Sequence, residues 1–488
     1  MASNPEITDT CNPVPISQED IEAADKLKNT ANDYFKKQNY DTAIEYYTKA
    51  IEKNPNNAVL HANRSIANLR LENFGYALND ASTAISLDRS YTKAYYRRAA
   101  AHMSLGKYKL ALKDFEYVTK VRPNDQDAKV KYNECNKIVK KIAFENAISV
   151  DKKEVSITDS INLDAMTIED EYEGPELEDG KVTVKFVTEL MNHYEQQKTL
   201  HKKYAYKILI DVKAYLQQQP SLIDIKVQDD EKFTVCGDIH GQYYDLMNIF
   251  KLNGLPSETN PYLFNGDFVD RGSFSVECIF TLFSFKLLYP NHFYMSRGNH
   301  ETRDMNRMYG FMGEVTSKYT TQMADLFTEV YNWLPLAHCI NGRVLVMHGG
   351  LFSKDNVTLD DIRNVDRNKQ PPEDESDFLD RKFVSAPEVT PMAGRAPSRR
   401  GVGCQFGPDV TAAFIQSNGL DYVIRSHEVK DAGYEVAHNG KCITVFSAPN
   451  YCDTMGNLGA FITMNGKDLK PNFTSYEAVV SVKHNKII

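Results

Sequence analysis

Residues 262–272 read YLFNGDFVDRG, a short apolar run that ends abruptly in charged residues and glycines. The same pattern recurs in the second half of the chain, in apolar runs at 233–236, 293–296, 344–347, 422–424 and 443–446. Strands that end this way place polar residues on loops along one edge of a sheet, where αβ proteins carry functional groups. The glycines allow the tight turns that such loops need. This recurring pattern of apolar runs with polar ends predicts an α/β domain over residues 182–480.

The polar ends of these runs offer a set of oxygen and nitrogen donors: Asp238, His240, Asp267, Asn299, His348 and His427. No thiolate cage accompanies them, which argues against a structural zinc site. Carboxylate, amide and imidazole together suit manganese, iron or zinc better than calcium. The set is too large for one catalytic metal with open positions, so it predicts two divalent ions bridged by Asp267. Such a centre activates a water molecule for an in-line attack on a phosphate.

Five segments appear in a fixed order along this domain: GDIHG from 237, GDFVDRG from 266, RGNHE from 297, HGG from 348 and RSHE from 425. In this order they resemble the phosphoprotein phosphatase family of serine/threonine phosphatases. The resemblance implies a central β-sandwich flanked by helices. It also implies hydrolysis of phosphoserine and phosphothreonine by a hydroxide that bridges two ions, Mn²⁺ and/or Fe²⁺ or Zn²⁺, with Mg²⁺ as an alternative.

The resemblance also implies roles for individual residues. One ion is held by Asp238, His240 and Asp267, and the other by Asp267, Asn299, His348 and His427. The phosphate is held by Arg271, Asn299, Arg400 and Tyr451. His300 protonates the leaving group, as a general acid oriented by Asp270. Spacing alone makes Arg425 an alternative to Arg400, but the family places it outside the phosphate site. Glu301 could equally support the ligands.

The first third of the chain repeats with a period of 34 residues, as Ala43, Ala77 and Ala111 illustrate. This period is typical of the tetratricopeptide family, whose paired helices stack into an all-α solenoid. We predict a repeat domain over 23–148, with units at 24–57, 58–91 and 92–125 and a cap helix from 126 to about 148.

Five positions of these repeats hold cations and amides: Lys28, Asn32, Asn63, Lys93 and Arg97. In chaperone-binding members of the tetratricopeptide family, these positions bind a C-terminal carboxylate, for which such donors are suited. Arg70 could assist. The resemblance implies the acidic tail of a heat-shock chaperone of the 90-kDa or 70-kDa class as partner. The alternative is that these are ordinary solvated side chains, which accounts poorly for all five together.

The remaining segments are predicted to be connectors. Residues 1–22 are a flexible tail, residues 149–181 an acidic linker and residues 481–488 a short tail. Within the linker, residues 169–179 read EDEYEGPELED, which favours an exposed connector or surface loop. A helical stretch follows at about 183–218. Family members continue into a C-terminal helix that latches the repeats over the active site, so the altered end predicts weaker autoinhibition here.

Composition excludes several classes of protein. The net charge of -9 argues against a general nucleic-acid binder. No apolar run reaches the roughly 18 residues of a membrane span, and the polar first residues do not resemble a signal peptide. The scattered cysteines favour a reducing compartment. With the resemblance, this predicts a cytoplasmic and nuclear location.

One segment departs from the family pattern. Residues 375–390 read ESDFLDRKFVSAPEVT, where family members carry Leu-Trp-Ser-Asp-Pro. This leaves an alternative, a chaperone-docked scaffold with an impaired phosphatase domain. Cysteine phosphatases are excluded because no cysteine is followed by arginine six residues later, and no P-loop motif is present.

Overall fold

The computed structural model describes residues 16–149, 156–370, 388–390, 392–398 and 404–479. The chain divides into two compact units, with the main boundary near residue 152. Arg400, residues 375–387 and residues 481–488 lie outside the described residues, so the predictions made for them stay predictions. No helix in the described ranges is long and apolar enough to cross a membrane.

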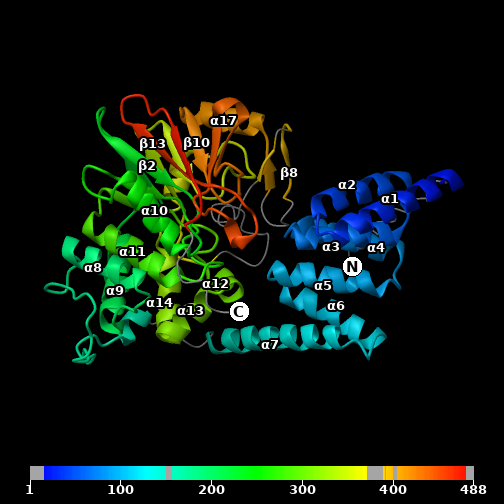
Figure 1. Ribbon diagram of the computed structural model, residues 1–488, viewed down its shortest axis with the longest axis horizontal. Helices are drawn as coiled ribbons and strands as arrows, with labels where there is room; N and C mark the ends of the chain where they lie inside the picture. The colour runs from blue at the N-terminus through cyan, green and yellow to red at the C-terminus, as the bar shows by residue number, and fades with distance from the viewer. Residues whose placement is uncertain (1–15, 150–155, 371–387, 391, 399–403, 480–488) are drawn as a thin grey trace, which may run out of the picture. The chain divides into compact units, whose positions relative to one another are not determined.

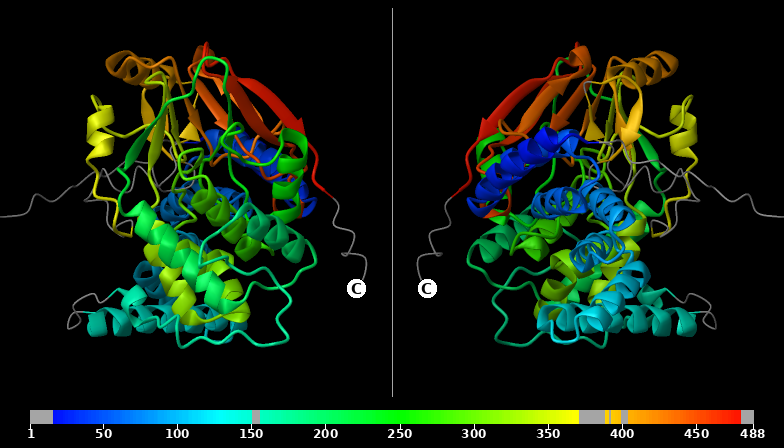
Figure 2. Two further views of the ribbon diagram at one scale, coloured as in Figure 1. Left: turned by 90° about the vertical axis from the view of Figure 1, so that its left-hand side faces the viewer. Right: turned by 90° about the vertical axis from the view of Figure 1, so that its right-hand side faces the viewer.

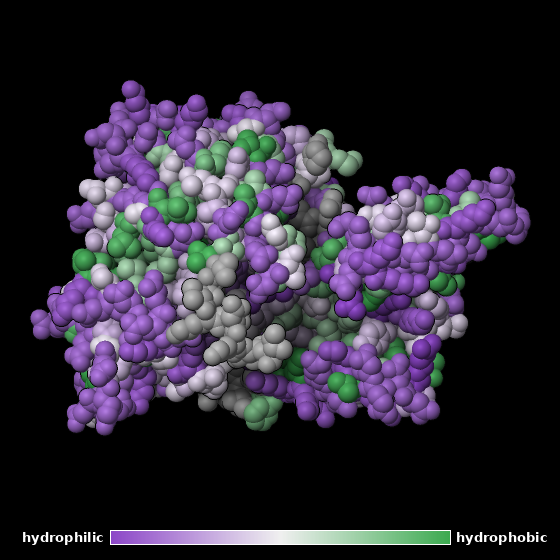
Figure 3. Space-filling view, viewed as in Figure 1, coloured by the Kyte–Doolittle hydropathy of each residue, from purple (hydrophilic) through white to green (hydrophobic). Residues whose placement is uncertain are grey.

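The first unit is a stack of helix pairs (Figure 1). Its helices are α1 (Gln18–Lys36), α2 (Tyr40–Lys53), α3 (Ala58–Arg70), α4 (Phe74–Leu87), α5 (Thr92–Ser104), α6 (Tyr108–Val121) and α7 (Gln126–Ser149). Helices α3, α5 and α7 begin 34 residues apart, at Ala58, Thr92 and Gln126. This confirms the predicted solenoid. The surface of this unit seen in Figure 3 is mainly hydrophilic, with scattered apolar side chains.

Small residues and repeated ion pairs hold the helix pairs together. Ala43, Ala77 and Ala111 are fully buried and let neighbouring helices approach closely. Arg64 pairs with Asp80 at 2.7 Å, and one repeat later Arg98 pairs with Asp114 at 2.8 Å. The sequence period predicted the alanines, but the ion pairs were not predicted.

The second unit is built on two β-sheets that form a sandwich (Figure 2). The six-stranded sheet contains, in spatial order, β1 (Leu222–Ile225), β5 (Ala337–Ile340), β6 (Val344–Met347), β10 (Tyr422–Arg425), β12 (Cys442–Val445) and β11 (Tyr434–Ala437). The five-stranded sheet contains β14 (Asn472–Tyr476), β13 (Gly459–Asn465), β2 (Lys232–Cys236), β3 (Tyr262–Phe264) and β4 (Phe293–Met295). A small sheet contains β7 (Glu388–Val389), β9 (Cys404–Phe406) and β8 (Arg395–Pro397).

The strand register brings the polar loops to one edge of the sandwich. Strands β2, β3 and β4 are parallel, and so are β6, β10 and β12. The last residues of β2, β3 and β4 are aligned, because Cys236 pairs with Phe264 and Phe264 with Met295. Buried aliphatic residues such as Val235, Leu263 and Val346 fill the space between the sheets.

Helices cover the outer faces of the sandwich. A large core joins the five-stranded sheet to α8 (Val184–Glu195), α9 (Lys202–Leu216), α10 (Tyr243–Asn253), α11 (Ser275–Leu288), α13 (Phe311–Lys318) and α14 (Thr321–Asn332). A second core joins the six-stranded sheet to α15 (Leu359–Arg363) and α17 (Pro408–Asn418). Short elements complete the unit: η1 (Ile157–Ser160), α12 (Arg303–Tyr309), η2 (His438–Gly440) and η3 (Tyr451–Asp453). The predicted α/β sandwich flanked by helices is confirmed.

Some predicted boundaries are wrong. Helix α1 begins at Gln18, inside the predicted tail 1–22. From residue 156 the predicted linker is no free connector, because its apolar residues pack against the helices of the second unit: Ile157, Ile161, Leu163, Met166, Ile168, Tyr172 and Leu177. The acidic composition concealed this spaced apolar set. The helical stretch predicted at 183–218 is two helices, α8 and α9, separated at 196–201.

Candidate metal centre

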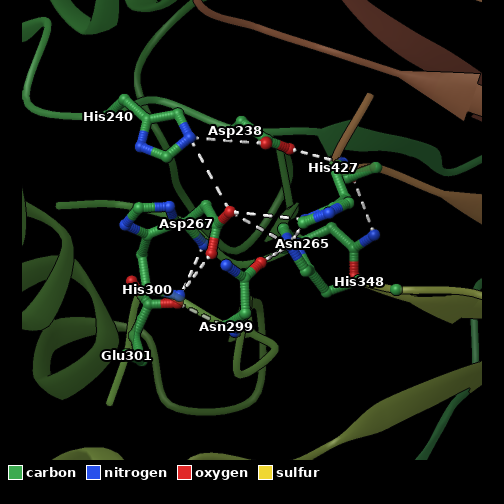
Figure 4. A network of polar contacts seen from close by, with 12 residues as sticks. Asp238, His240, Asn265, Asp267, Asn299, His300, Glu301, His348 and His427 are labelled. Carbon is green, nitrogen blue, oxygen red and sulfur yellow. Dashed lines mark hydrogen bonds and ion pairs between the residues drawn. The ribbon is translucent and has the colours of Figure 1, made fainter. Parts of the chain in front are cut away.

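Loops from both sheets bring the predicted ligands together (Figure 4). Asp238 and His240 follow β2, Asp267 follows β3 and Asn299 follows β4 in the five-stranded sheet. His348 follows β6 and His427 follows β10 in the six-stranded sheet. All are buried except Asn299, which is half-buried.

Asp267 lies at the centre of this group. Its Oδ2 is 3.1 Å from Nε2 of His348, 3.7 Å from Nε2 of His240 and 3.8 Å from Nδ1 of His427. It therefore belongs to both clusters that could hold a metal ion in the described part of the chain, one with His240 and His300 and one with His348 and His427. Asp238 lies beside the first cluster, with its Oδ2 3.6 Å from Nε2 of His240.

Backbone carbonyls fix two of the imidazoles. Nδ1 of His240 donates to the carbonyl of Val269 at 3.0 Å, and Nδ1 of His348 donates to the carbonyl of Asn265 at 2.7 Å. In each ring this leaves Nε2 facing Asp267, the arrangement typical of a metal-binding histidine. Nε2 of His348 also lies 3.1 Å from Oδ1 of Asn299. Lone pairs therefore converge on one place, and a cation would satisfy them.

The electrostatics of the site favour positive charge. Burial opposes a charged imidazole at His348, but the Asp267 carboxylate outweighs it and raises the pKa of His348 to about 9. Burial likewise opposes ionisation of Asp267, yet His348 and His300 hold its pKa well below the usual range. A buried carboxylate kept ionised among imidazoles fits divalent cations.

The expected general acid lies next to this centre. Nδ1 of His300 donates to Oδ2 of Asp270 at 2.8 Å. Asp270 is fully buried, and its carboxylate also accepts from the backbone N–H of Phe311 at 2.9 Å and from Nδ2 of Asn306 at 3.0 Å. The His300 ring lies 4.7 Å from that of His240. Nδ1 is thus engaged, and Nε2 is the ring nitrogen left for chemistry.

Besides Asn299, two predicted phosphate-binding side chains lie beside this centre. The guanidinium of Arg271 stacks 3.8 Å above the ring of Tyr309, which also lies 5.2 Å from the His300 ring. The ring of Tyr451 lies 5.0 Å from that of His240. Arg425 is fully buried and donates to the carbonyl of Gly349 at 2.6 Å.

Backbone conformation marks the same loops. Non-glycine residues of the site adopt positive φ angles: His240 (47°), Asp267 (53°), Asp270 (72°), Arg271 (71°) and His427 (76°). Each such residue costs about 1–3 kcal/mol and persists only where its surroundings hold it. The loops also need glycine, because a Cβ on Gly298 would lie 2.2 Å from Oδ1 of Asp267. Strain concentrated in this way is typical of functional sites.

Sequence reasoning missed several supporting residues. Asn265 Nδ2 donates to the carbonyl of Met347 and to Oγ of Ser426, both at 2.9 Å, so it links the loops that carry His348 and His427. Asn306 and Tyr309 were also not predicted. For Asn265, the only available signal was its position directly after an apolar run, and its partners Met347 and Ser426 are distant in sequence.

Glu301, for which the sequence also allowed a supporting role, contacts the backbone of two loops that carry predicted ligands. Its carboxylate accepts backbone N–H groups of Asp267 at 2.8 Å, Phe268 at 2.9 Å and Gly298 at 2.8 Å. Burial, with Asp267 adding to it, raises the pKa of Glu301 to about 8. Glu301 therefore orients the loop that holds Asp267.

The predicted tail-binding residues lie on α1, α3 and α5, the first helices of the three repeats. Nδ2 of Asn63 donates to Oδ1 of Asn32 at 3.4 Å, and Nη1 of Arg97 donates to Oδ1 of Asn63 at 3.4 Å. Lys28 pairs with Asp25 at 2.5 Å, and Lys93 is exposed. Three of the five residues thus form one contiguous polar row.

Comparison with protein families agrees with both units. Residues 231–431 match the calcineurin-like phosphoesterase family, and residues 132–224 match the PPP5 TPR repeat region. Residues 24–57 and 92–125 match the tetratricopeptide repeat, with the bounds predicted for the first and third units.

Whole-chain relatives extend this agreement. The chain is 61% identical to serine/threonine-protein phosphatase 5 of Homo sapiens, over 94% of this chain and 91% of the relative. It is 51% identical to serine/threonine-protein phosphatase T of Trypanosoma brucei brucei, over 94% of this chain and 96% of that relative. A solved protein serine/threonine phosphatase from Saccharomyces cerevisiae, 39% identical, covers 61% of this chain and 97% of that chain with a TM-score of 0.58. The chain belongs to the serine/threonine-protein phosphatase 5 family.

Proposed function

We propose that this chain is a metal-dependent phosphatase that hydrolyses phosphoserine and phosphothreonine in proteins. One observation carries the proposal above all. The Asp267 carboxylate faces imidazoles on two sides, beside a histidine that is itself oriented by a buried aspartate. Phosphoester hydrolysis needs both features, charge stabilisation at the phosphate and a proton for the leaving oxygen.

Two divalent ions would be held by the converging donors. Asp238, His240 and Asp267 would hold one ion, and Asp267, Asn299, His348 and His427 the other. When bound, such ions neutralise phosphate charge and lower the pKa of a water molecule. The mixed donors suit manganese, iron or zinc. The carbonyls that engage Nδ1 of His240 and His348 keep both rings turned toward the ions.

The chain's own residues would bind the phosphate and deliver the proton. Arg271 offers parallel N–H groups to the phosphoryl oxygens, and the stacked ring of Tyr309 fixes its plane. Asn299, Tyr451 and Arg400 would complete the binding, Arg400 from outside the described residues. His300 then donates its Nε2 proton to the leaving serine or threonine oxygen. Asp270 holds Nδ1 and stabilises the charged imidazolium before transfer.

The repeats would recruit the enzyme to acidic C-terminal tails. The cations and amide N–H groups of the five predicted residues suit a terminal carboxylate. The contacts that join Asn32, Asn63 and Arg97 support a single shared site. The proposed partners are heat-shock chaperones of the 90-kDa class. The proposed location is cytoplasmic and nuclear, as in the family resemblance.

The activity is tested by hydrolysis of a phosphoserine peptide and of para-nitrophenyl phosphate in the presence of Mn²⁺. We expect Asp270→Asn and His300→Gln to lower kcat on the peptide by about 10²–10⁴-fold, the usual contribution of general acid catalysis. The loss on para-nitrophenyl phosphate should be smaller, because its leaving group needs little protonation. His292→Gln, remote from the site, serves as the matched control. Absence of turnover by folded, metal-loaded wild type would contradict the proposed activity.

A further inference from the structure

The polar row formed by Asn32, Asn63 and Arg97 continues to a buried tyrosine. The hydroxyl of Tyr47, on α2, donates to Oδ1 of Asn32 at 2.6 Å. Tyr47 is 2% exposed, and burial raises its pKa to about 12. The hydroxyl therefore stays protonated at neutral pH and keeps its role as a donor. Asn63 donates to the same oxygen.

These contacts determine which way the Asn32 amide points. An asparagine side chain has one oxygen that accepts and one NH₂ group that donates, and rotation exchanges them. A guanidinium only donates, so the contact with Arg97 makes the Asn63 oxygen an acceptor and leaves the Asn63 NH₂ group to donate to Asn32. Asn32 must then present its oxygen, because a rotated amide would place two NH₂ groups against each other. The Tyr47 hydroxyl donates to the oxygen placed in this way and holds it.

Comparison of the repeats shows that packing does not require the Tyr47 hydroxyl. The equivalent residues of the second and third units are Ala81 and Phe115, both fully buried or nearly so. Neither has a hydroxyl. The positions equivalent to Asn32 are Ile66 and Ala100, which are also apolar. The hydroxyl–amide pair is therefore specific to the first repeat, because the other two repeats have apolar residues at both positions.

We propose that Tyr47 is a positioning residue of the tail-binding site, which holds the Asn32 amide with its N–H groups toward the ligand. A carboxylate only accepts hydrogen bonds, whereas a terminal amide also donates them. An amide locked as a donor favours a peptide that ends in a free α-carboxylate. Tyr47 thereby sets the preference for a charged chain end. This inference rests on the proposed tail-binding function.

The test compares two forms of one acidic seven-residue peptide, with a free C-terminal carboxylate or a C-terminal amide. Their Kd values are measured by calorimetry on the full chain. We expect Tyr47→Phe to weaken binding of the free acid about tenfold, the usual scale for a hydrogen bond to a charged group. Binding of the amidated peptide should not change. Phe115 fills the equivalent position, so Tyr47→Phe should fold, as a thermal melt by circular dichroism checks.

Two further variants sharpen the test. Tyr46→Phe is the matched control, one residue away on the same helix, with a ring that stacks on Tyr34 at 5.4 Å. It should leave both Kd values unchanged. In an Asn32→Ala background, Tyr47→Phe should have no further effect, because the two residues act through one interaction.

Each contrary result has a distinct meaning. If wild type fails to prefer the free acid, the tail-binding function is wrong and the inference falls with it. If wild type prefers the acid and Tyr47→Phe retains that preference, the inference alone is overturned. Equal weakening of both peptides, or additive losses with Asn32→Ala, would show that Tyr47 only packs the helices, and would also overturn it.

Discussion

Beside His300, the proposed general acid, the buried amide of Asn306 contacts two groups. Nδ2 of Asn306 donates to Oδ2 of Asp270 at 3.0 Å and to the carbonyl of His300 at 2.6 Å, and its side chain is 3% exposed. Asn306→Leu should leave the His300–Asp270 pair present but loosely oriented. We expect kcat on a phosphopeptide to fall about tenfold with little change in KM, as for residues that orient a functional group.

The substrate dependence of that loss separates positioning from general damage. If Asn306 acts through His300, para-nitrophenyl phosphate turnover should fall less than phosphopeptide turnover, since proton donation matters less for its leaving group. Equal losses on both substrates, or a rise in KM alone, would contradict the positioning role. Retained Mn²⁺ binding by the variant checks that the metal centre is intact.

A second effect at the residue scale concerns His338 of β5, which is not part of the proposed metal centre. Burial, with the nearby Lys286 cation adding to it, lowers the pKa of His338 to about 3. In the unfolded chain a histidine pKa is about 6.5. Between these values the unfolded chain binds a proton that the folded chain does not, so the free energy of unfolding falls as pH falls. From this group alone we expect a loss of about 2 kcal/mol between pH 7 and pH 5.

The measurement is urea unfolding at pH 7, 6 and 5, followed by tryptophan fluorescence. The chain has a single tryptophan, Trp333, which lies in the second unit and reports on that unit. His338→Gln removes the titrating group, so its unfolding free energy should depend less steeply on pH than that of wild type. Parallel pH dependences would show that His338 does not carry this effect.

At the scale of elements, the segment 156–181 is attached to the helices by a partly buried ion pair. Nζ of Lys213, on α9, contacts Glu329, on α14, and donates to Oγ of Ser156 at 2.6 Å. Glu329 also accepts the backbone N–H of Ile157 at 2.8 Å. Glu329→Leu would leave Lys213 without its counter-ion. We expect a loss of about 1–3 kcal/mol, below the value for a fully buried pair because Glu329 is partly exposed.

Hydrogen exchange locates that change. The amides of residues 157–168 should exchange faster in Glu329→Leu than in wild type, because their polar anchor is lost. Lys207→Ala on the same helix is the control, since Lys207 and Asp211 form a partly exposed pair whose contribution is within about 1 kcal/mol. Unchanged exchange over 157–168 would show that apolar packing alone holds this segment.

The same elements show what a single sequence can predict. The helices of the repeats were predictable because their period of 34 residues is local and recurs in buried alanines such as Ala43 and Ala77. The strand ends were predictable because apolar runs stop abruptly at charged residues, histidines and glycines. Segment 156–181 was not, since its acidic residues masked the spaced apolar ones. Asn265 was not, because its partners Met347 and Ser426 lie 82 and 161 residues away.

For the whole second unit, the residues of the proposed metal centre come from both sheets of the sandwich. Asp238, Asp267 and Asn299 follow strands of one sheet, and His348 and His427 follow strands of the other. Asn265 adds a direct polar link between the same layers. An ion bound here would crosslink both sheets, so its binding free energy should stabilise the unit as a whole.

This predicts a metal-dependent stability that the Trp333 signal can follow. Removal of metal by a chelator should lower the free energy of unfolding measured in urea, and Mn²⁺ should restore about 3–4 kcal/mol per bound ion when the free ion is at 100 to 1,000 times its Kd. Asp267→Asn removes the carboxylate shared by both clusters and should abolish most of this response. His292→Gln should respond like wild type. A full Mn²⁺ response in Asp267→Asn would mean that the ions stabilise the fold without the carboxylate that joins the two clusters, and the two-ion arrangement would have to be rejected.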